Sequence, residues 1–375
     1  MGKADRRDFI KKLGVAVTGA AGVAGPLNVW GASMDREEGL KNPRGTRLEW
    51  DLITTWPAHF PILGEGVDLF SQWVGEMSNG RLKINVHGGG EQVPPLGVFD
   101  AVSTGEVQMG HGASYYWAAK CPASQFFTGI PFGFNAQIMN TWLYSGGGME
   151  LWREVYREFN LVPFVAGNTG VQMGGWFNRR IESMADFRGL RMRIPGVGAK
   201  VLTRAGGRAV LVSGEDLCSH MAKGWVDATE WIGPFHDMEM GLHRVASYYY
   251  HPGWHENGSA LELILNRDAW EQLPGDLQSI VEAAAVRLNL WMLSEFEARN
   301  TAALAELVHV HGVKLRQFPI PVLKKLKRIS GQVLEELANE DPQGRRVYDA
   351  LTAFGEDARV WNRLSEGGYQ GLKYL

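Results

Sequence analysis

Apolar and polar residues alternate along this chain with two periods that follow one another. The segment RLEWDLITTW (47–56) alternates apolar and polar positions, as a β-strand does. The segment GVDLFSQWVGEMSNG (66–80) has apolar residues at helical spacing and stops at a glycine. A second strand pattern, RLKINVHGGG (81–90), then leads into a glycine-rich loop. Strand and helix patterns in alternation predict an α/β fold with largely parallel sheets.

The longest helical pattern lies in the last third of the chain. Residues 276–311 keep helical spacing without proline or glycine until Gly312. A helix of this length would be about 54 Å long at 1.5 Å per residue, which is longer than one lobe of such a protein. Two shorter amphipathic patterns follow, at 321–339 and 343–364. We therefore expect a long helix that spans two lobes, followed by C-terminal helices.

Two segments share one design and place two loops at corresponding positions. Residues 99–113 and 219–233 each have the pattern of a helix end, a glycine, a short strand and a loop. In open α/β sheets, ligands bind at the carboxyl ends of the strands. Two lobes built in this way and facing each other would form a cleft between the loops HGASYYW and TEWIGP.

The N-terminal segment differs in character from the rest of the chain. Arg6 and Arg7 precede a weakly apolar stretch, residues 13–24, that is too short and too rich in glycine and alanine to span a bilayer stably. Adjacent arginines before a modest apolar region are typical of a twin-arginine export signal. A free amphipathic helix is the alternative, which the glycines disfavour. We therefore expect a periplasmic protein exported by the twin-arginine pathway.

These patterns together suggest how the chain is divided. After the signal no apolar run reaches membrane-spanning length, so we expect the mature protein to be soluble. The expected parts are the twin-arginine export signal (1–31), a linker (32–46), lobe I (47–166 plus about 252–275), lobe II (167–251 plus parts of 312–340), the long spanning helix (276–311) and a C-terminal helical extension (341–375).

Composition excludes some classes of partner and of bond. The 375 residues are 45% hydrophobic and 21% charged, and their formal net charge of −3 provides no basic surface for nucleic acid. The two cysteines, Cys121 and Cys218, form neither a disulfide framework nor a C-x-x-C motif. One disulfide between them is an open alternative, but two buried thiols that act as small apolar residues are favoured.

Charged residues stand at two expected strand ends. Glu230 and Trp231 are adjacent in DATEWIGPFHD (227–237), which is either a surface turn or a ligand site with an apolar wall. Arg193 follows alternating apolar residues and precedes Ile194 and a proline, so we expect it at a strand end beside the cleft. An arginine in that position suits bidentate binding of a carboxylate. Arg193 at one expected strand end and Glu230 at another favour the ligand site over the surface turn.

A further candidate stretch, HENGS, lies between an aromatic run and the apolar strand ALELILN. No histidine follows His255 at the fourth position that a zinc helix motif requires, so we interpret it as a packed or surface residue. Glu230 and Glu256 could form the acid/base pair of an exported hydrolase. The chain contains no G-x-S-x-G, H-E-x-x-H or phosphate loop, and we expect that it is not an enzyme.

Several widely spaced motifs together resemble those of the substrate-binding proteins of TRAP (tripartite ATP-independent periplasmic) transporters. They are the export signal, GRLKINVHGGGEQVP, FDAVSTGEVQMGHGASYYW, NTGVQMGGWFN, LRMRIPG, DATEWIGP and the long helix. The resemblance covers essentially everything after the linker. It is greatest to the subgroup that captures small 2-oxo or 2-hydroxy monocarboxylates, such as pyruvate or lactate, with a metal ion. It implies a two-lobed periplasmic-binding-protein-like fold, delivery to the permease subunits of the transporter, and a homodimer, as in part of this subgroup.

The same resemblance implies roles for individual residues. Arg193 would form a salt bridge with the ligand carboxylate, and Glu256 stands where the subgroup often has glutamine, which leaves the metal open between calcium and sodium. Because Glu230 and Glu256 carry two negative charges, calcium is favoured. The expected ligand-binding residues are Arg193, Gln172, Trp231, Tyr116, Asn168 and Glu256, and the expected metal-binding residues are Gln172, Glu230, Trp231 through its backbone carbonyl, and Glu256.

Overall fold

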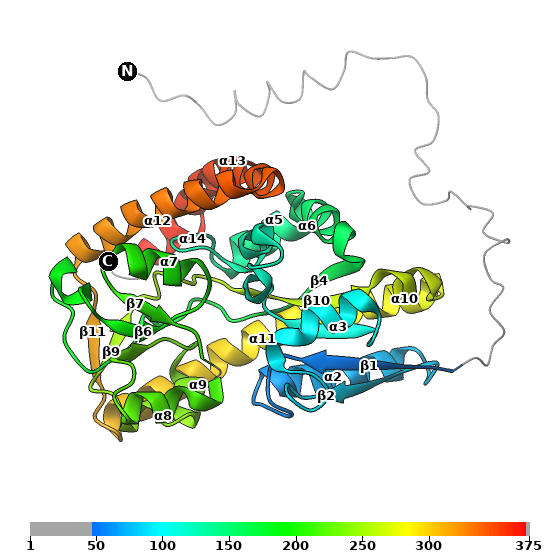
Figure 1. The fold of residues 1–375 in the computed structure, drawn as a ribbon, viewed down its shortest axis with the longest axis horizontal. Helices are drawn as coiled ribbons and strands as arrows, with labels where there is room; N and C mark the ends of the chain where they lie inside the picture. Colours follow the sequence, from blue (N-terminus) through cyan, green and yellow to red (C-terminus); the bar gives the residue numbers. More distant parts are fainter. Residues whose placement is uncertain (1–46, 213, 373–375) are drawn as a thin grey trace, which may run out of the picture. The chain divides into compact units, whose positions relative to one another are not determined.

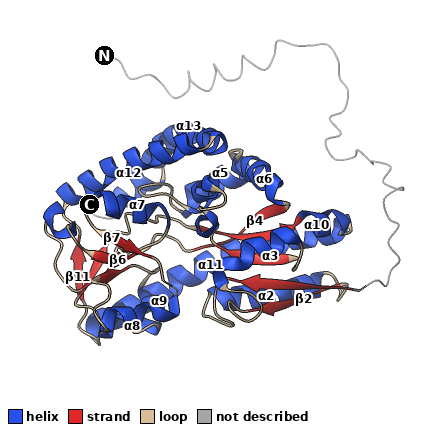
Figure 2. Cartoon of the chain, viewed as in Figure 1, coloured by secondary structure: helices blue, strands red, loops and turns tan. Residues whose placement is uncertain are grey.

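Two β-sheets organise the part of the chain that the computed structural model describes, residues 47–212 and 214–372 (Figure 2). The first sheet, on which lobe I is built, has the strand order β2–β1–β3–β10–β4, and the second, in lobe II, has the order β11–β9–β5–β8–β6–β7. The expected export signal and linker lie outside the described residues. The strands are β1 (Leu48–Thr54), β2 (Leu82–His87), β3 (Met109–Gly112), β4 (Leu161–Asn168), β5 (Gly175–Phe177), β6 (Arg191–Arg193), β7 (Arg208–Val210), β8 (Ala228–Thr229), β9 (Tyr248–His251), β10 (Ala260–Asn266) and β11 (Lys314–Gln317).

Both sheets are mixed, but in each sheet all strands except one run in the same direction, so the expectation of largely parallel sheets holds apart from β10 and β5. Strand β10 runs antiparallel to β3 and β4, and β5 runs antiparallel to β8 and β9. The reason lies in the connections. The chain enters β5 directly from β4 of the first sheet and enters β10 directly from β9 of the second. A parallel neighbour requires a crossover connection that returns the chain to the same end of its own sheet. Neither β5 nor β10 follows such a connection.

Helices pack on both sheets where the apolar spacing predicts them. In α2, the buried residues Val67, Phe70 and Val74 lie on one face and pack against the first sheet. The observed helix starts three residues before the predicted one. The helices are α2 (Leu63–Met77), α3 (Val98–Thr104), α4 (Gln125–Thr128), α5 (Ala136–Ser145), α6 (Gly148–Tyr156), α7 (Gly196–Arg204), α8 (Leu217–Ala222), α9 (Pro234–Glu239), α10 (Arg267–Gln272), α11 (Gly275–His309), α12 (Ile320–Glu340), α13 (Pro342–Leu364) and α14 (Glu366–Leu372).

The repeated design predicted for two segments is present in both lobes. Helices α3 and α8 are each followed within two residues by a glycine with positive φ, Gly105 (+80°) and Gly224 (+64°). A left-handed conformation at the end of a helix costs glycine little, because it has no Cβ. The chain then enters β3 and β8, and the loops that follow these strands both reach the cavities described below.

The long helix α11 runs between the two sheets and contributes to the apolar core of each (Figure 1). Leu288, Met292 and Phe296 pack with α2 and the first sheet, and Leu307 packs with Trp176 of the second. Its 35 residues correspond to about 52 Å. The prediction of one continuous helix from 276 to 311 is confirmed to within two residues. No helix among the described residues has the length and apolar character needed to cross a bilayer.

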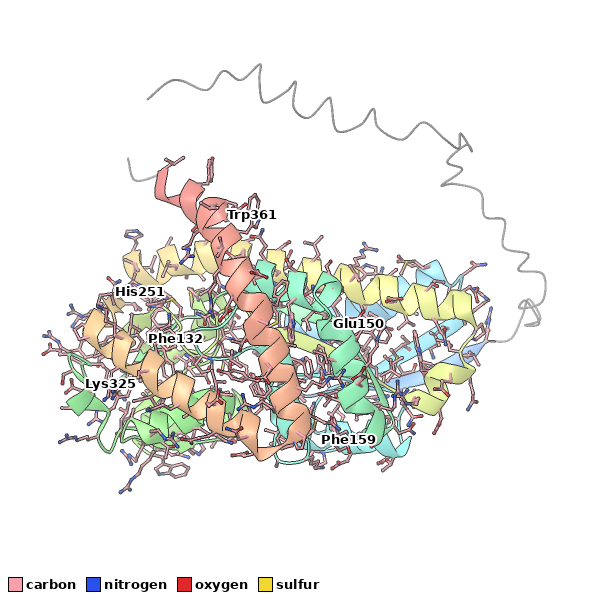
Figure 3. The ribbon with its side chains drawn as sticks, turned by 90° about the horizontal axis from the view of Figure 1, so that it is seen from above. Phe132, Glu150, Phe159, His251, Lys325 and Trp361 are labelled. Atoms are coloured by element: carbon pink, nitrogen blue, oxygen red, sulfur yellow. The ribbon has the colours of Figure 1, made fainter. Side chains whose placement is uncertain are left out.

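The C-terminal helices pack on both lobes before they leave the core. Helix α12 lies on α7, and the first turns of α13 bury Val347 and Leu351 with Phe126 of α4. The second half of α13 extends past the other helices, with Trp361 70% exposed (Figure 3). Residues 341–375 therefore include a part that completes the core, not only an appendage.

The two cysteines lie in different surroundings, and neither forms a disulfide within residues 47–212 and 214–372. Cys121 is buried beside the first sheet, whereas Cys218 on α8 is half-buried and lines a cavity. The interpretation of two buried thiols thus holds for Cys121 only.

Candidate functional site

Two segments that cross between the sheets lie side by side and form the floor of the candidate site. Residues 169–174 connect β4 to β5, and residues 252–259 connect β9 to β10. The amide of Gln172 donates to the carbonyl of Glu256 at 3.2 Å, and the amide of Gly253 donates back to the carbonyl of Gln172 at 2.9 Å. Side chains from both sheets can therefore meet where the segments cross.

Arg193 and Glu230 form a buried ion pair above this floor. Arg193 is the last residue of β6 and Glu230 follows β8, as expected for residues at neighbouring strand ends. A guanidinium Nη1 of Arg193 donates to Oε1 of Glu230, and the side chains are 3% and 1% exposed. Burial is the largest single influence on the pKa of Arg193 and would lower it, but Glu230 together with Tyr116 and Tyr115 raises the pKa above its usual value. The guanidinium also lies 5.2 Å from the centre of the Trp231 ring.

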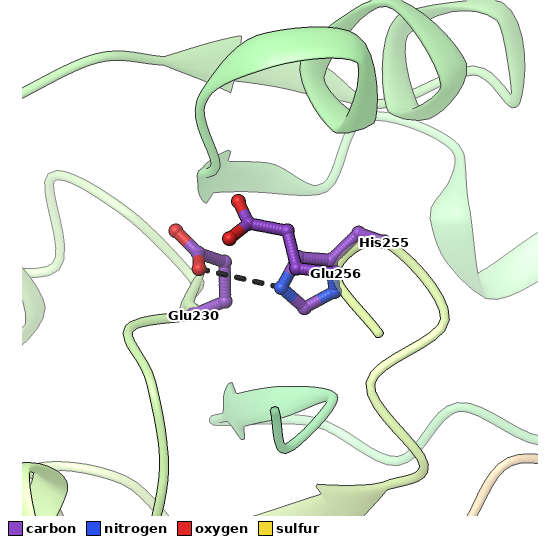
Figure 4. Close-up of side chains that lie close together, drawn as sticks. All are labelled: Glu230, His255 and Glu256. Carbon is purple, nitrogen blue, oxygen red and sulfur yellow. Dashed lines mark hydrogen bonds and ion pairs between the residues drawn. The ribbon is translucent and has the colours of Figure 1, made fainter. Parts of the chain in front are cut away.

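Glu230, His255 and Glu256 converge on one small volume (Figure 4). Oε2 of Glu230 lies 3.3 Å from Nε2 of His255. One ligand atom from each of the three side chains lies within 4.8 Å of the others. His255 is packed, as the sequence suggested, but its imidazole lies against the expected metal ligand Glu230. Sequence reasoning missed this contact because the two residues are 25 positions apart and share no motif.

Gln172 holds Glu256 while leaving its own oxygen free. Nε2 of Gln172 donates to Oε2 of Glu256 at 2.8 Å, and the hydroxyl of Ser259 donates to the same oxygen. Oε1 of Gln172 is buried and accepts no hydrogen bond from the described residues. Burial, then repulsion by Glu230, raises the pKa of Glu256 to about 7. A cation at this position would satisfy the free oxygen and offset the two negative charges, so the residues present fit a metal ion.

The other predicted ligand-binding residues occupy two different positions. Tyr116 lines the cavities, and burial raises the pKa of its phenol. Asn168 instead joins the crossing segments, because its Oδ1 accepts from the amide of Gly170 at 2.9 Å and its Nδ2 donates to the carbonyl of Gly258 at 3.2 Å. Asn168 does not line either cavity described below.

Two cavities meet at the ion pair. An inner cavity of about 20 Å³ is lined by Gln172, Glu230 and Arg193, and it could hold about one water molecule or ion. An outer cavity of about 800 Å³ shares Arg193 with it. The outer cavity has mainly apolar walls: Trp56, Phe60, Pro95, Leu96, Leu211, Val212, Trp231 and Met240. A charged base under apolar walls suits a small organic anion.

A protein family and a curated relative both match most of this chain. A family model described as bacterial extracellular solute-binding protein, family 7, matches residues 53–341. A curated relative from Nostoc sp., the monocarboxylate 2-oxoacid-binding periplasmic protein, is 40% identical over 336 residues, which are 90% of this chain and 90% of the relative.

Solved structures of TRAP periplasmic solute-binding proteins are also similar. The Colwellia psychrerythraea protein, with bound calcium and pyruvate, is 39% identical, has a TM-score of 0.85, and covers 87% of this chain and 99% of its own. The Bordetella bronchiseptica protein, a mixed-occupancy dimer with copurified calcium and picolinate, is 37% identical with a TM-score of 0.85. The match covers 88% of this chain and 98% of that protein. The Pseudoalteromonas atlantica protein, with sodium and pyruvate, is 37% identical with a TM-score of 0.84, covering 87% and 99%.

These findings confirm the resemblance and the two-lobed fold that the sequence predicted. The family match covers more than half of the chain, and the curated relative aligns along most of its length. The chain therefore belongs to family 7 of the bacterial extracellular solute-binding proteins, the family of TRAP transporter receptors.

Proposed function

We propose that this chain captures a small monocarboxylate together with a metal ion and delivers it to the permease subunits of a TRAP transporter. A 2-oxo or 2-hydroxy acid such as pyruvate or lactate is the expected ligand. The observation that carries the proposal is Arg193, buried at the base of an apolar cavity and beside Glu230 and the free oxygen of Gln172. Relatives that bind pyruvate with calcium or sodium support it.

The charges of the site favour calcium over sodium. With Glu230, Glu256 and the acid's carboxylate ionised, Arg193 offsets one of three negative charges, and a divalent cation offsets the other two. Sodium would leave one negative charge uncompensated in a buried site, which is costly. The carboxylates of Glu230 and Glu256, the oxygen of Gln172 and the backbone carbonyl of Trp231 are the hard oxygen ligands that calcium prefers.

Arg193 has a second role in this proposal. In the structure its guanidinium is bound to Glu230. When a metal ion takes up the charge of Glu230, the planar guanidinium becomes available for two parallel hydrogen bonds to the acid. The metal would polarise the second oxygen of a 2-oxo or 2-hydroxy acid. Tyr116 supplies a neutral donor at the cavity wall, and Trp231 limits the access of water.

A hydrolase is the alternative that this geometry disfavours. Glu230 is held by Arg193, and Glu256 is held by Gln172 and Ser259, so both carboxylates already have partners. We propose that the protein has no turnover of its own. The twin-arginine pathway remains the proposed export route, since the arginine pair at residues 6 and 7 precedes a short apolar stretch. The lobe limits given above likewise stay a prediction.

A homodimer is the proposed assembly. The end of α13 and α14 exposes large apolar side chains, among them Val360, Trp361, Leu364, Tyr369 and Leu372. Such a surface is typical of an interface. The dimer of the Bordetella bronchiseptica relative supports this assignment. Sedimentation should show a dimer that Trp361→Glu converts to a monomer, and a monomeric native protein would contradict it.

A thermal-shift screen tests the function itself. The purified protein with calcium should melt at a higher temperature in the presence of 2-oxo or 2-hydroxy monocarboxylates than with matched amines or sugars. Arg193→Lys keeps the charge but loses the two-donor fork. It should therefore need at least a tenfold higher acid concentration to give the same rise in melting temperature. A native protein that responds to no monocarboxylate, or an Arg193→Lys variant that responds equally, would overturn the proposal.

A further inference from the structure

His255 occupies the position of a metal ligand, although its sequence context gave no such indication. Its side chain is buried, and its Nε2 lies 3.3 Å from Oε2 of Glu230. Hydrogen bonds from N–H groups to oxygen are usually 2.7–3.2 Å long, so this contact is weak as a hydrogen bond. The other ring nitrogen, Nδ1, is buried and has no hydrogen-bond partner among residues 47–212 and 214–372.

The separation of the two atoms matches that of two ligands on one metal ion. Zinc binds nitrogen and oxygen ligands at about 2.0–2.1 Å in a tetrahedron, which places two ligand atoms about 3.3–3.4 Å apart. Oε2 of Glu230 and Nε2 of His255 already have this spacing. Glu256 completes a group of three ligand atoms within 4.8 Å of one another, and the free Oε1 of Gln172 lies at the same floor.

The imidazole of His255 is held in place by its surroundings. The backbone of α7 lies against the first carbon of the side chain: a Cβ added at Gly198 would lie 3.2 Å from Cβ of His255. The Trp254 ring contacts the imidazole edge to face, with 5.6 Å between ring centres. A ligand held in this way loses little conformational freedom on binding a metal.

We propose that His255 adds a nitrogen ligand to the metal centre, so that this site binds a borderline transition-metal ion such as zinc in addition to calcium. The inference rests on the proposed metal site and extends it. Imidazole nitrogen suits zinc, copper and nickel, whereas calcium takes oxygen ligands. His255 therefore changes the affinity for zinc but contributes little to the affinity for calcium.

The test is a pair of metal titrations on the chelator-treated full-length protein, without any carboxylic acid. By calorimetry, His255→Gln should weaken zinc binding at least tenfold and weaken calcium binding much less than zinc binding, because calcium takes oxygen ligands. His311→Gln is the matched control. It removes an exposed histidine whose ring lies 4.4 Å from that of His243, a pair that could bind zinc weakly at the surface. This control variant should keep the strong zinc binding.

Equal zinc affinity in the native protein and His255→Gln would overturn the inference, as would a zinc loss that appears only in His311→Gln. If His255→Gln does not fold, the inference is tested on the native protein instead. Loaded with one equivalent of copper(II), its electron spin-echo spectrum should show the modulation of a bound imidazole, retained in His311→Gln. Its absence would refute nitrogen ligation. If pyruvate binding depends on calcium but His255→Gln leaves the zinc affinity unchanged, only this inference is contradicted. If zinc binds through His255 but no acid binds, only the proposed function is contradicted.

Discussion

Removing the positive charge of the buried Arg193–Glu230 pair should destabilise the protein in the absence of metal. Arg193→Met keeps much of the side-chain length but leaves Glu230 without its guanidinium partner in a site that also holds Glu256. Because the side chains of the pair are 3% and 1% exposed, water cannot replace the lost partner. Breaking such a buried pair costs about 3–5 kcal/mol of unfolding free energy.

Removing both charges should be less harmful than removing the arginine alone. In Arg193→Met/Glu230→Gln neither member leaves an unpaired charge, so we expect the double variant to recover more than half of the loss. The coupling energy between the two substitutions should be about 2 kcal/mol or more. Calcium should stabilise Arg193→Met more than the native protein, because the ion then compensates a carboxylate that has no other cation beside it.

Urea unfolding of the four proteins in chelator, followed by fluorescence, measures these free energies. Glu230→Gln provides the matched single substitution for the double-mutant cycle. If the two single substitutions add within about 0.5 kcal/mol, the pair is not coupled and the reasoning fails. Equal stabilisation of all four proteins by calcium would likewise contradict a role for Glu230 in metal binding.

Three further predictions address the metal, the pH dependence and the motion. Glu256→Gln should weaken calcium binding and shift the preference towards sodium in calorimetric titrations; unchanged calcium affinity would exclude Glu256 as a ligand. Burial raises the pKa of Glu262 to about 7, so the folded protein keeps a proton there that the unfolded chain loses above its ordinary pKa of 4.5. The unfolding free energy measured in urea should therefore fall between pH 4.5 and 7, by up to about 1.4 kcal/mol per pH unit for this group. The unfolding free energy of Glu262→Gln should fall less steeply with pH, and equal slopes for the two proteins would refute the role of Glu262. Finally, two lobes joined by crossing segments should close on the ligand, and small-angle scattering with calcium and the acid should show a smaller radius of gyration than without them.

Local patterns predicted the elements on which the site is built. Arg193 could be placed at a strand end because apolar residues alternate before it and Pro195 follows it, and β6 ends at Arg193. The long helix could be predicted because its residues keep one period without a helix breaker. The antiparallel direction of β5 and β10 could not be predicted, since these two strands take their direction from where the chain enters each sheet.

The contacts of His255 and Ser259 were beyond the reach of the sequence for a related reason. His255 contacts Glu230, which follows β8 and lies 25 positions away, and Ser259 donates to Glu256 within the same crossing segment. No periodicity predicts these contacts, because His255, Glu256 and Ser259 lie in a segment outside regular strands. The free oxygen of Gln172 likewise becomes visible only when the donors around it are known.

The most direct test is an isothermal titration of pyruvate, and then of lactate and longer 2-oxo acids, into the chelator-treated protein. The same titrations are repeated with calcium restored and with sodium alone. Arg193, Glu230 and the free oxygen of Gln172 predict that at least one acid binds strongly with calcium and at least a hundredfold more weakly without it, because Arg193 is released from Glu230 only when a cation takes its place. Acid binding of full strength in chelator, or in sodium alone, would contradict a calcium-dependent site.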